Sequence, residues 1–382
     1  MTALPSVLAG VLLLAAVPAR AETPPSAAEP APRASPRKRH SQGPKARPKR
    51  HGRTAPATKA APGVRRLAPG RWRPEVADAL ERLLEQEGAG REDYSDADPP
   101  VAVFGWEDVS ITHRLGEAVF RRLVTRADFK FSEEFWGEVP EVYGRARLRS
   151  DYESFRDHAQ ASWPKEPAYR SYRKGFLRCY QRMCAAEGAK SCARWLTVLL
   201  KGFSQDELRN YSTETIRQEF LRPVGEELAV DDIDDPAPVK MPVGLRRIPE
   251  MADLYRRLLD RGFDVWVLSG SNDWSLKTMA AMYGVDGSRA VGVRCKVVND
   301  KLTADVLIPI PVGSGQAEAL TLFVGRPPSL VVASSGDSEL LGYGRGVRIA
   351  VADAGAGGAV WERKGWLYQP RFSPVRPPQE FQ

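Results

Sequence analysis

Polar residues follow three apolar stretches that the sequence predicts to be buried strands. These stretches are residues 101–104, 265–268 and 330–333, and the polar residues after them lie at 105–108, 269–271 and 336–338. Parallel strands bring their carboxyl ends to one edge of a sheet, so we expect the three polar segments to lie close together. Their side chains would then share one cleft.

The residue types in these segments suit an anion site beside a cation site. Ser269 and Gly270 precede a predicted helix, and a helix N-terminus attracts anions such as phosphate. The carboxylate of Asp337 offers the hard oxygen atoms that Mg²⁺ prefers. The first segment has no side chain at Gly105, and its acids are Glu107 and Asp108.

The elements around these segments predict an α/β fold. A long, mostly helical stretch separates the first strand from the second, and strands alternate with helices after it. Such alternation predicts a parallel sheet flanked by helices. We expect two core segments at 71–112 and 243–375, a helical insertion at 113–242 and a short tail at 376–382.

This order of elements and these residues resemble the haloacid dehalogenase-like phosphatases, especially the branch of phosphoserine phosphatase and phosphorylcholine phosphatase. The resemblance covers about residues 72–369. In that family a strand leads to Asp-x-Asp-x-Thr, in which the first Asp is the nucleophile and the second is the general acid and base. The resemblance implies a Rossmann-like core, a helical cap at 113–242, a Mg²⁺ cofactor and a small phosphorylated ligand.

The first motif departs from the family pattern. Gly105 stands at the nucleophile position, Glu107 at the acid and base, and Val109 at the threonine. Loss of a covalent nucleophile typically costs about 10⁴–10⁶ in rate. A shifted reading with Asp108 as nucleophile requires a charged residue at the end of the buried strand. It also breaks the spacing to the stretch 116–118, which is typical of the branch.

The other motifs are partly retained. Ser269, with Gly270, matches the phosphate-binding residue, and Asp337 matches a metal ligand that the backbone carbonyl of Glu107 would join. The usual second acid after Asp337 is missing. Gln316 stands where a lysine is expected, a loss worth about 1.5–3 kcal/mol in phosphate binding. An alternative interpretation is that the serine and aspartate only cap loops.

The N-terminus reads as a signal peptide at 1–21. An apolar run at 7–17 precedes small residues at the cleavage positions, and it is too short to span a membrane. We therefore expect an exported protein, periplasmic or secreted, that is not transmembrane.

Residues 22–70 are predicted to be a disordered, Pro- and Ala-rich basic linker. Between positions 22 and 68 there are twelve Lys or Arg residues, two acids and no aromatic residue. Such a segment can bind an anionic envelope polymer by charge. Because no aromatic side chain is available for base stacking, specific nucleic-acid binding is not expected.

Three of the four cysteines, Cys179, Cys184 and Cys192, lie close together in the sequence. One disulfide among them would suit an oxidising compartment, and free buried thiols fit the sequence equally well. Their spacing does not match a zinc site.

Three hypotheses follow. The leading one is a phosphatase-like protein that has lost the phosphoaspartate mechanism and binds a ligand or partner in the former cleft. The second is an active Mg²⁺-dependent hydrolase of a small phosphomonoester, in which Asp108 or Glu107 activates water. The third is an envelope interaction protein that acts through its basic linker.

Overall fold

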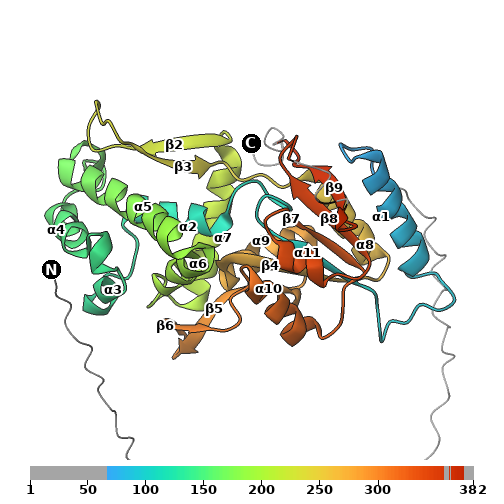
Figure 1. Ribbon diagram of the computed structural model, residues 1–382. Helices are drawn as coiled ribbons and strands as arrows, with labels where there is room; N and C mark the ends of the chain where they lie inside the picture. Colours follow the sequence, from blue (N-terminus) through green and yellow to red (C-terminus); the bar gives the residue numbers. More distant parts are fainter. Residues whose placement is uncertain (1–66, 357–360, 362, 374–382) are drawn as a thin grey trace, which may run out of the picture. The chain divides into compact units, whose positions relative to one another are not determined.

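The computed structural model describes residues 67–356, 361 and 363–373 (Figure 1). The predicted signal peptide at 1–21, residues 22–66 of the basic linker and the tail at 376–382 lie outside the described residues. Among the described residues, no helix combines the length and the apolar character that a membrane crossing requires.

Seven strands form one sheet in which every neighbouring pair but one runs parallel. In spatial order the strands are β6 (Lys301–Leu307), β5 (Ala290–Val298), β4 (Asp264–Asn272), β1 (Val101–Gly105), β7 (Leu330–Ser334), β8 (Val347–Ala352) and β9 (Leu367–Pro370). Strands β5 and β6 are antiparallel across Asn299 and Asp300, whose φ angles of 50° and 61° suit a tight hairpin turn. The mostly parallel sheet with its flanking helices confirms the predicted α/β fold class.

Helices cover both faces of the sheet (Figure 1). Along β1, Ala102 and Phe104 pack into one apolar cluster, whereas Val101 and Val103 pack into another, because successive side chains of a strand point to opposite faces. Helices of the first cluster are α1 (Pro74–Glu87), α8 (Pro249–Asp260) and α9 (Asp273–Ala280). Those of the second are α10 (Ser314–Ala319), the π-helical turn Leu320–Val324, and α11 (Ser338–Tyr343). Burial on both faces explains the continuous apolar sequence of β1.

The chain between β1 and β4 is mainly helical. Its helices are α2 (Leu115–Arg126), α3 (Glu133–Gly137), α4 (Arg145–Phe155), α5 (Pro167–Glu187), α6 (Ala189–Val198) and α7 (Gln205–Leu221). An antiparallel pair, β2 (Gly225–Ala229) and β3 (Val239–Val243), follows them, and the sequence pattern does not indicate it. That residues 113–242 form a separate cap stays a prediction.

Strand β4 runs beyond the predicted strand at 265–268 and includes Ser269, Gly270 and Ser271. The next helix, α9, begins only after Asn272, whose side chain accepts a hydrogen bond from Ser275 N at 2.9 Å. The predicted position of Ser269 and Gly270 at a helix N-terminus is therefore wrong. The strand register is irregular between Leu268 and Asn272, and both serine hydroxyl groups contact Glu107.

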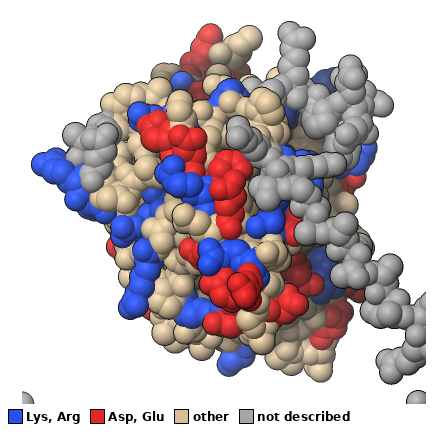
Figure 2. Space-filling model, turned by 90° about the vertical axis from the view of Figure 1, so that its right-hand side faces the viewer, with Lys and Arg blue, Asp and Glu red and all other residues tan. Residues whose placement is uncertain are grey.

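Charged side chains of both signs are interleaved on the face shown in Figure 2. Among the described residues of that face, no extensive field of one sign is present. The excess of Lys and Arg that gives the chain its net charge of +8 is concentrated at 22–66, outside the described residues.

A disulfide between Cys184 and Cys192 joins the end of α5 to the start of α6. The Cα atoms are 5.2 Å apart, within the usual range for a disulfide. The helices meet at Gly188, whose φ of 85° is readily adopted by glycine. Cys179, the third candidate, and Cys295 are free and buried.

Replacing Cys184 and Cys192 by alanine is expected to lower the free energy of unfolding by roughly 2–3 kcal/mol, because the crosslink restricts the unfolded chain. Denaturant unfolding of the oxidised proteins measures this difference. Reductant should lower the midpoint of the parent and of a Cys295→Ala control, and leave the double variant unchanged. A parent protein insensitive to reductant would contradict the pairing.

Candidate functional site

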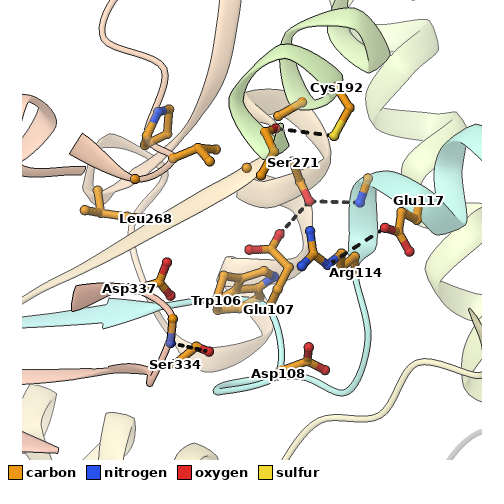
Figure 3. Close-up of a pocket in the computed structure, with 18 of the residues that line it drawn as sticks. Trp106, Glu107, Asp108, Arg114, Glu117, Cys192, Leu268, Ser271, Ser334 and Asp337 are labelled. Carbon is orange, nitrogen blue, oxygen red and sulfur yellow. Dashed lines mark hydrogen bonds and ion pairs between the residues drawn. The ribbon is translucent and has the colours of Figure 1, made fainter. Parts of the chain in front are cut away.

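The chain reverses sharply after β1, and this turn carries the acids of the first motif. The backbone N–H groups of residues 109–111 all donate to Trp106 O, at 3.0–3.4 Å. Asp108 has a φ of 58°, in the left-handed region that aspartate tolerates better than most residues. Figure 3 shows the result: Glu107 points toward Ser271 of β4, whereas Asp108 lies apart from it.

Gly105, the last residue of β1, lies beside Asp337, which follows β7. A Cβ atom built on Gly105 would be 3.5 Å from Asp337 Oδ2 and 3.5 Å from Ala333 Cα, both ordinary contact distances. Sterics therefore do not require glycine here. The first and third polar segments meet as expected, and the missing side chain at Gly105 is a difference in chemistry that packing does not impose.

Two serines of β4 hold the carboxylate of Glu107. Ser271 Oγ donates to Glu107 Oε1 at 2.7 Å, and Ser269 Oγ donates to the same oxygen. Each hydroxyl oxygen also accepts a backbone N–H: Ser269 Oγ from Ser271 N at 2.9 Å, and Ser271 Oγ from Gly116 N at 2.8 Å. The second polar segment thus meets the first, and Ser271, which the sequence did not single out, is as much a part of the contact as Ser269.

Gln316 contacts Asp337 across the cleft. Its Nε2 donates to Asp337 Oδ1 at 3.0 Å. The pKa of Asp337 is raised to about 6. Burial is the main cause, the hydrogen bond from Gln316 lowers the pKa, and the charge of Glu107 raises it. Gln316 Oε1 is buried and has no hydrogen-bond partner within the described part of the chain.

The start of α2 adds a second acidic group that sequence reasoning missed. Tyr180 of α5 donates its hydroxyl to Glu117 Oε1 at 2.7 Å, and Arg114 Nε lies 3.8 Å from the same oxygen. Burial raises the pKa of the Glu117 carboxyl, against the effects of Tyr180 and Arg114. The sequence offered one signal for this group: Arg114 and Glu117 are three residues apart, a spacing that brings two side chains together on a helix.

Asp108 is engaged elsewhere. Its Oδ2 lies 2.8 Å from Arg371 Nη1, and its Oδ1 accepts a hydrogen bond from His113 N at 3.1 Å. Both oxygens of the Asp108 carboxylate therefore already have partners within the protein. The shifted reading, with Asp108 as the reacting group, therefore finds little support in this geometry.

These residues surround a cavity of about 330 Å³ between the sheet edge and helices α2, α5 and α6. Its polar wall includes Glu107, Glu117, Gln316 and Asp337. Gly270 also faces the cavity, and a Cβ atom there would come within 3.1 Å of Val312 Cγ2. The rest of the wall is largely apolar and includes Trp106, Ala189, Cys192, Ala193, Leu196, Leu268, Pro311 and Val312.

The donor set does not fit Mg²⁺, the ion that the family resemblance implies. The carboxylate expected at Gly105 is absent, and one oxygen of Asp337, Oδ1, already accepts an N–H of Gln316. Across the described ranges, no three His, Cys, Asp or Glu side chains are grouped to hold a metal ion. The predicted ligands, Asp337 and the carbonyl of Glu107, therefore lack partners.

Comparison with known proteins gives a fold and no activity. No protein-family model and no curated protein matches the chain. A conserved, functionally unknown protein from Anaerococcus prevotii has a TM-score of 0.65 at 18% identity, over 78% of this chain and 92% of that one. A protein of unknown function from Bordetella pertussis has a TM-score of 0.44 at 14% identity, over 71% of this chain and 98% of that one. A substrate-bound phosphoserine phosphatase has a TM-score of 0.35 at 13% identity, over 71% of this chain and 92% of that one. The first similarity shows a shared fold, and the other two are too distant to support an argument.

Proposed function

We propose that this protein has a haloacid dehalogenase-like phosphatase fold, has lost the phosphoaspartate mechanism, and binds a ligand in the former active-site cleft. The observation that carries the proposal is Gly105. It lies at the end of the central strand and next to Asp337, where a nucleophile would be needed, and a Cβ atom would fit there. With no side chain at this position, no phosphoaspartate can form.

The neighbouring residues support the same conclusion. Glu107, at the acid and base position, accepts hydrogen bonds from Ser269 and Ser271 through Oε1. Asp108 is paired with Arg371. Both acids are therefore engaged by groups of the protein itself.

The cleft nevertheless keeps Asp337, a group whose ionisation destabilises the folded state. The raised pKa of Asp337 means that its ionisation costs the folded state free energy at neutral pH. A loop cap that served only stability would not carry this cost, and the side chain makes no capping hydrogen bond to α11. The cost favours a ligand-binding role for Asp337 over the loop-cap interpretation.

We also propose that the protein is exported to the periplasm or secreted. Support comes from the apolar run at 7–17 and from the disulfide between Cys184 and Cys192, since disulfides persist in oxidising compartments.

Purified parent protein is expected to show no Mg²⁺-dependent hydrolysis of p-nitrophenyl phosphate above the rate of its Asp337→Asn and Asp108→Asn variants. The reason is the absent nucleophile, which typically costs about 10⁴–10⁶ in rate. Steady-state release of p-nitrophenol measures it. Turnover in the parent that either substitution abolishes would overturn the proposal.

The Gly105→Asp variant is expected to gain a Mg²⁺ response. A carboxylate there would lie beside Asp337, and two adjacent carboxylates attract a hard divalent cation. Millimolar MgCl₂ should raise the Tm of this variant and not that of the parent. Gly105→Asn, of similar size but uncharged, is the matched control. An equal response in the parent would show that an intact metal site is already present.

The Asp337→Asn variant is expected to be more stable than the parent above pH 6, with little difference near pH 4. Because the pKa of Asp337 is raised to about 6 in the folded state, the parent loses stability as pH rises through the interval from about 4 to 6. The difference approaches at most about 3 kcal/mol. Denaturant unfolding between pH 4 and 8 measures this difference, with Glu85→Gln, exposed on α1, as control. A pH-independent difference would contradict this assignment.

A further inference from the structure

The carboxylate of Glu107 lies where this cleft would otherwise bind an anion. Each serine hydroxyl has one proton to donate, and both Ser269 and Ser271 donate it to Glu107 Oε1. Their oxygen atoms accept backbone N–H groups in return. No hydroxyl proton of either serine is left for a phosphate oxygen. The protein thus supplies its own anion to these donors.

The charges around the cavity favour a cation. Three carboxylates, from Glu107, Glu117 and Asp337, face one guanidinium, that of Arg114. Asp108 also reaches the cavity wall, but Arg371 neutralises it. A cleft lined mainly by charges of one sign concentrates ligands of the opposite sign.

Gln316 gives a second, independent indication of the ligand. Its side chain is 95% buried and lines the cavity, and its Oε1 is a hydrogen-bond acceptor without a partner in the described part of the chain. An unpaired buried acceptor is costly and is relieved by a donor. A ligand that carries N–H groups would supply that donor.

We infer that the cleft binds a small organic cation with N–H donors, such as a primary alkylammonium ion, and excludes inorganic phosphate. The inference rests on the proposed function and specifies its ligand. Glu117 and Asp337 would face the ammonium group, and Gln316 Oε1 would accept one of its protons. The volume of about 330 Å³ and the apolar wall around Leu196 and Val312 suit a ligand with a short hydrocarbon part.

Thermal unfolding in a buffer free of amines and phosphate tests the inference with three probes at tens of millimolar. Ethanolamine is expected to raise the Tm of the parent protein. Tetramethylammonium, a cation without N–H donors, should raise it less, and sodium phosphate should have no effect beyond that of matched NaCl. No response to ethanolamine, or an equal or larger response to phosphate, overturns the inference. An equal response to tetramethylammonium overturns the requirement for N–H donors.

Two variants make the test specific. Glu107→Ala frees both serine hydroxyls and removes a negative charge, so phosphate binding should strengthen at least about tenfold. Glu117→Gln keeps an acceptor for Tyr180 while it removes charge, and it should weaken ethanolamine binding several-fold. This variant provides an independent test if Glu107→Ala fails to fold. Glu85→Ala, exposed on α1, is the control and should behave as the parent.

The outcomes separate this inference from the proposed function. Phosphate binding by the parent without any phosphatase turnover would overturn the cation preference and leave the loss of catalysis standing. Turnover in the parent would overturn the proposed function itself, whichever probe raises the Tm.

Discussion

The position of β1 at the centre of the sheet is the constraint on which the cleft depends. Strand β1 pairs in parallel with β4 on one side and with β7 on the other, and each of its five residues is buried. Backbone hydrogen bonds and apolar packing thus fix where the three strands end. This arrangement needs no catalytic side chain, so it does not depend on which polar residues line the cleft.

That constraint also determines which interactions the remaining polar groups can make. Glu107, Ser269 and Ser271 are brought together whether or not a ligand is present, so their hydrogen-bonding capacity must be met within the protein. The carboxylate of Glu107 and the two hydroxyls satisfy one another. Asp337 and Gln316 satisfy one another only in part. The pKa of Asp337 remains raised, and Gln316 Oε1 has no hydrogen-bond partner among the described residues. Any ligand-binding capacity of the cleft lies with these incompletely satisfied groups.

Sequence reasoning predicted the backbone frame well and the side-chain contacts poorly. Apolar runs and helical periodicity identified β1, β4 and β7, and hence the meeting of Gly105 with Asp337. The pattern could not place the end of β4, because Ser269 and Ser271 suit a loop as well as a strand. The contact between Glu117 and Tyr180 joins α2 to α5, and such a contact depends on helix packing that one sequence does not reveal. The sequence likewise did not reveal which cysteines pair, because the pairing depends on the turn at Gly188 between α5 and α6.

The replacements at Gly105 and Gln316, measured against the family pattern, make physical sense as a pair. The pattern has an aspartate at one position and a lysine at the other, so losing both leaves the local net charge unchanged. A lysine at position 316 would pair with Asp337, as the N–H of Gln316 does now, and would offset one of the three carboxylates of the cleft. Gln316 retains an N–H donor to Asp337 without that charge. Under the proposed function, the two differences together would leave the negative charge of the cleft available to a ligand.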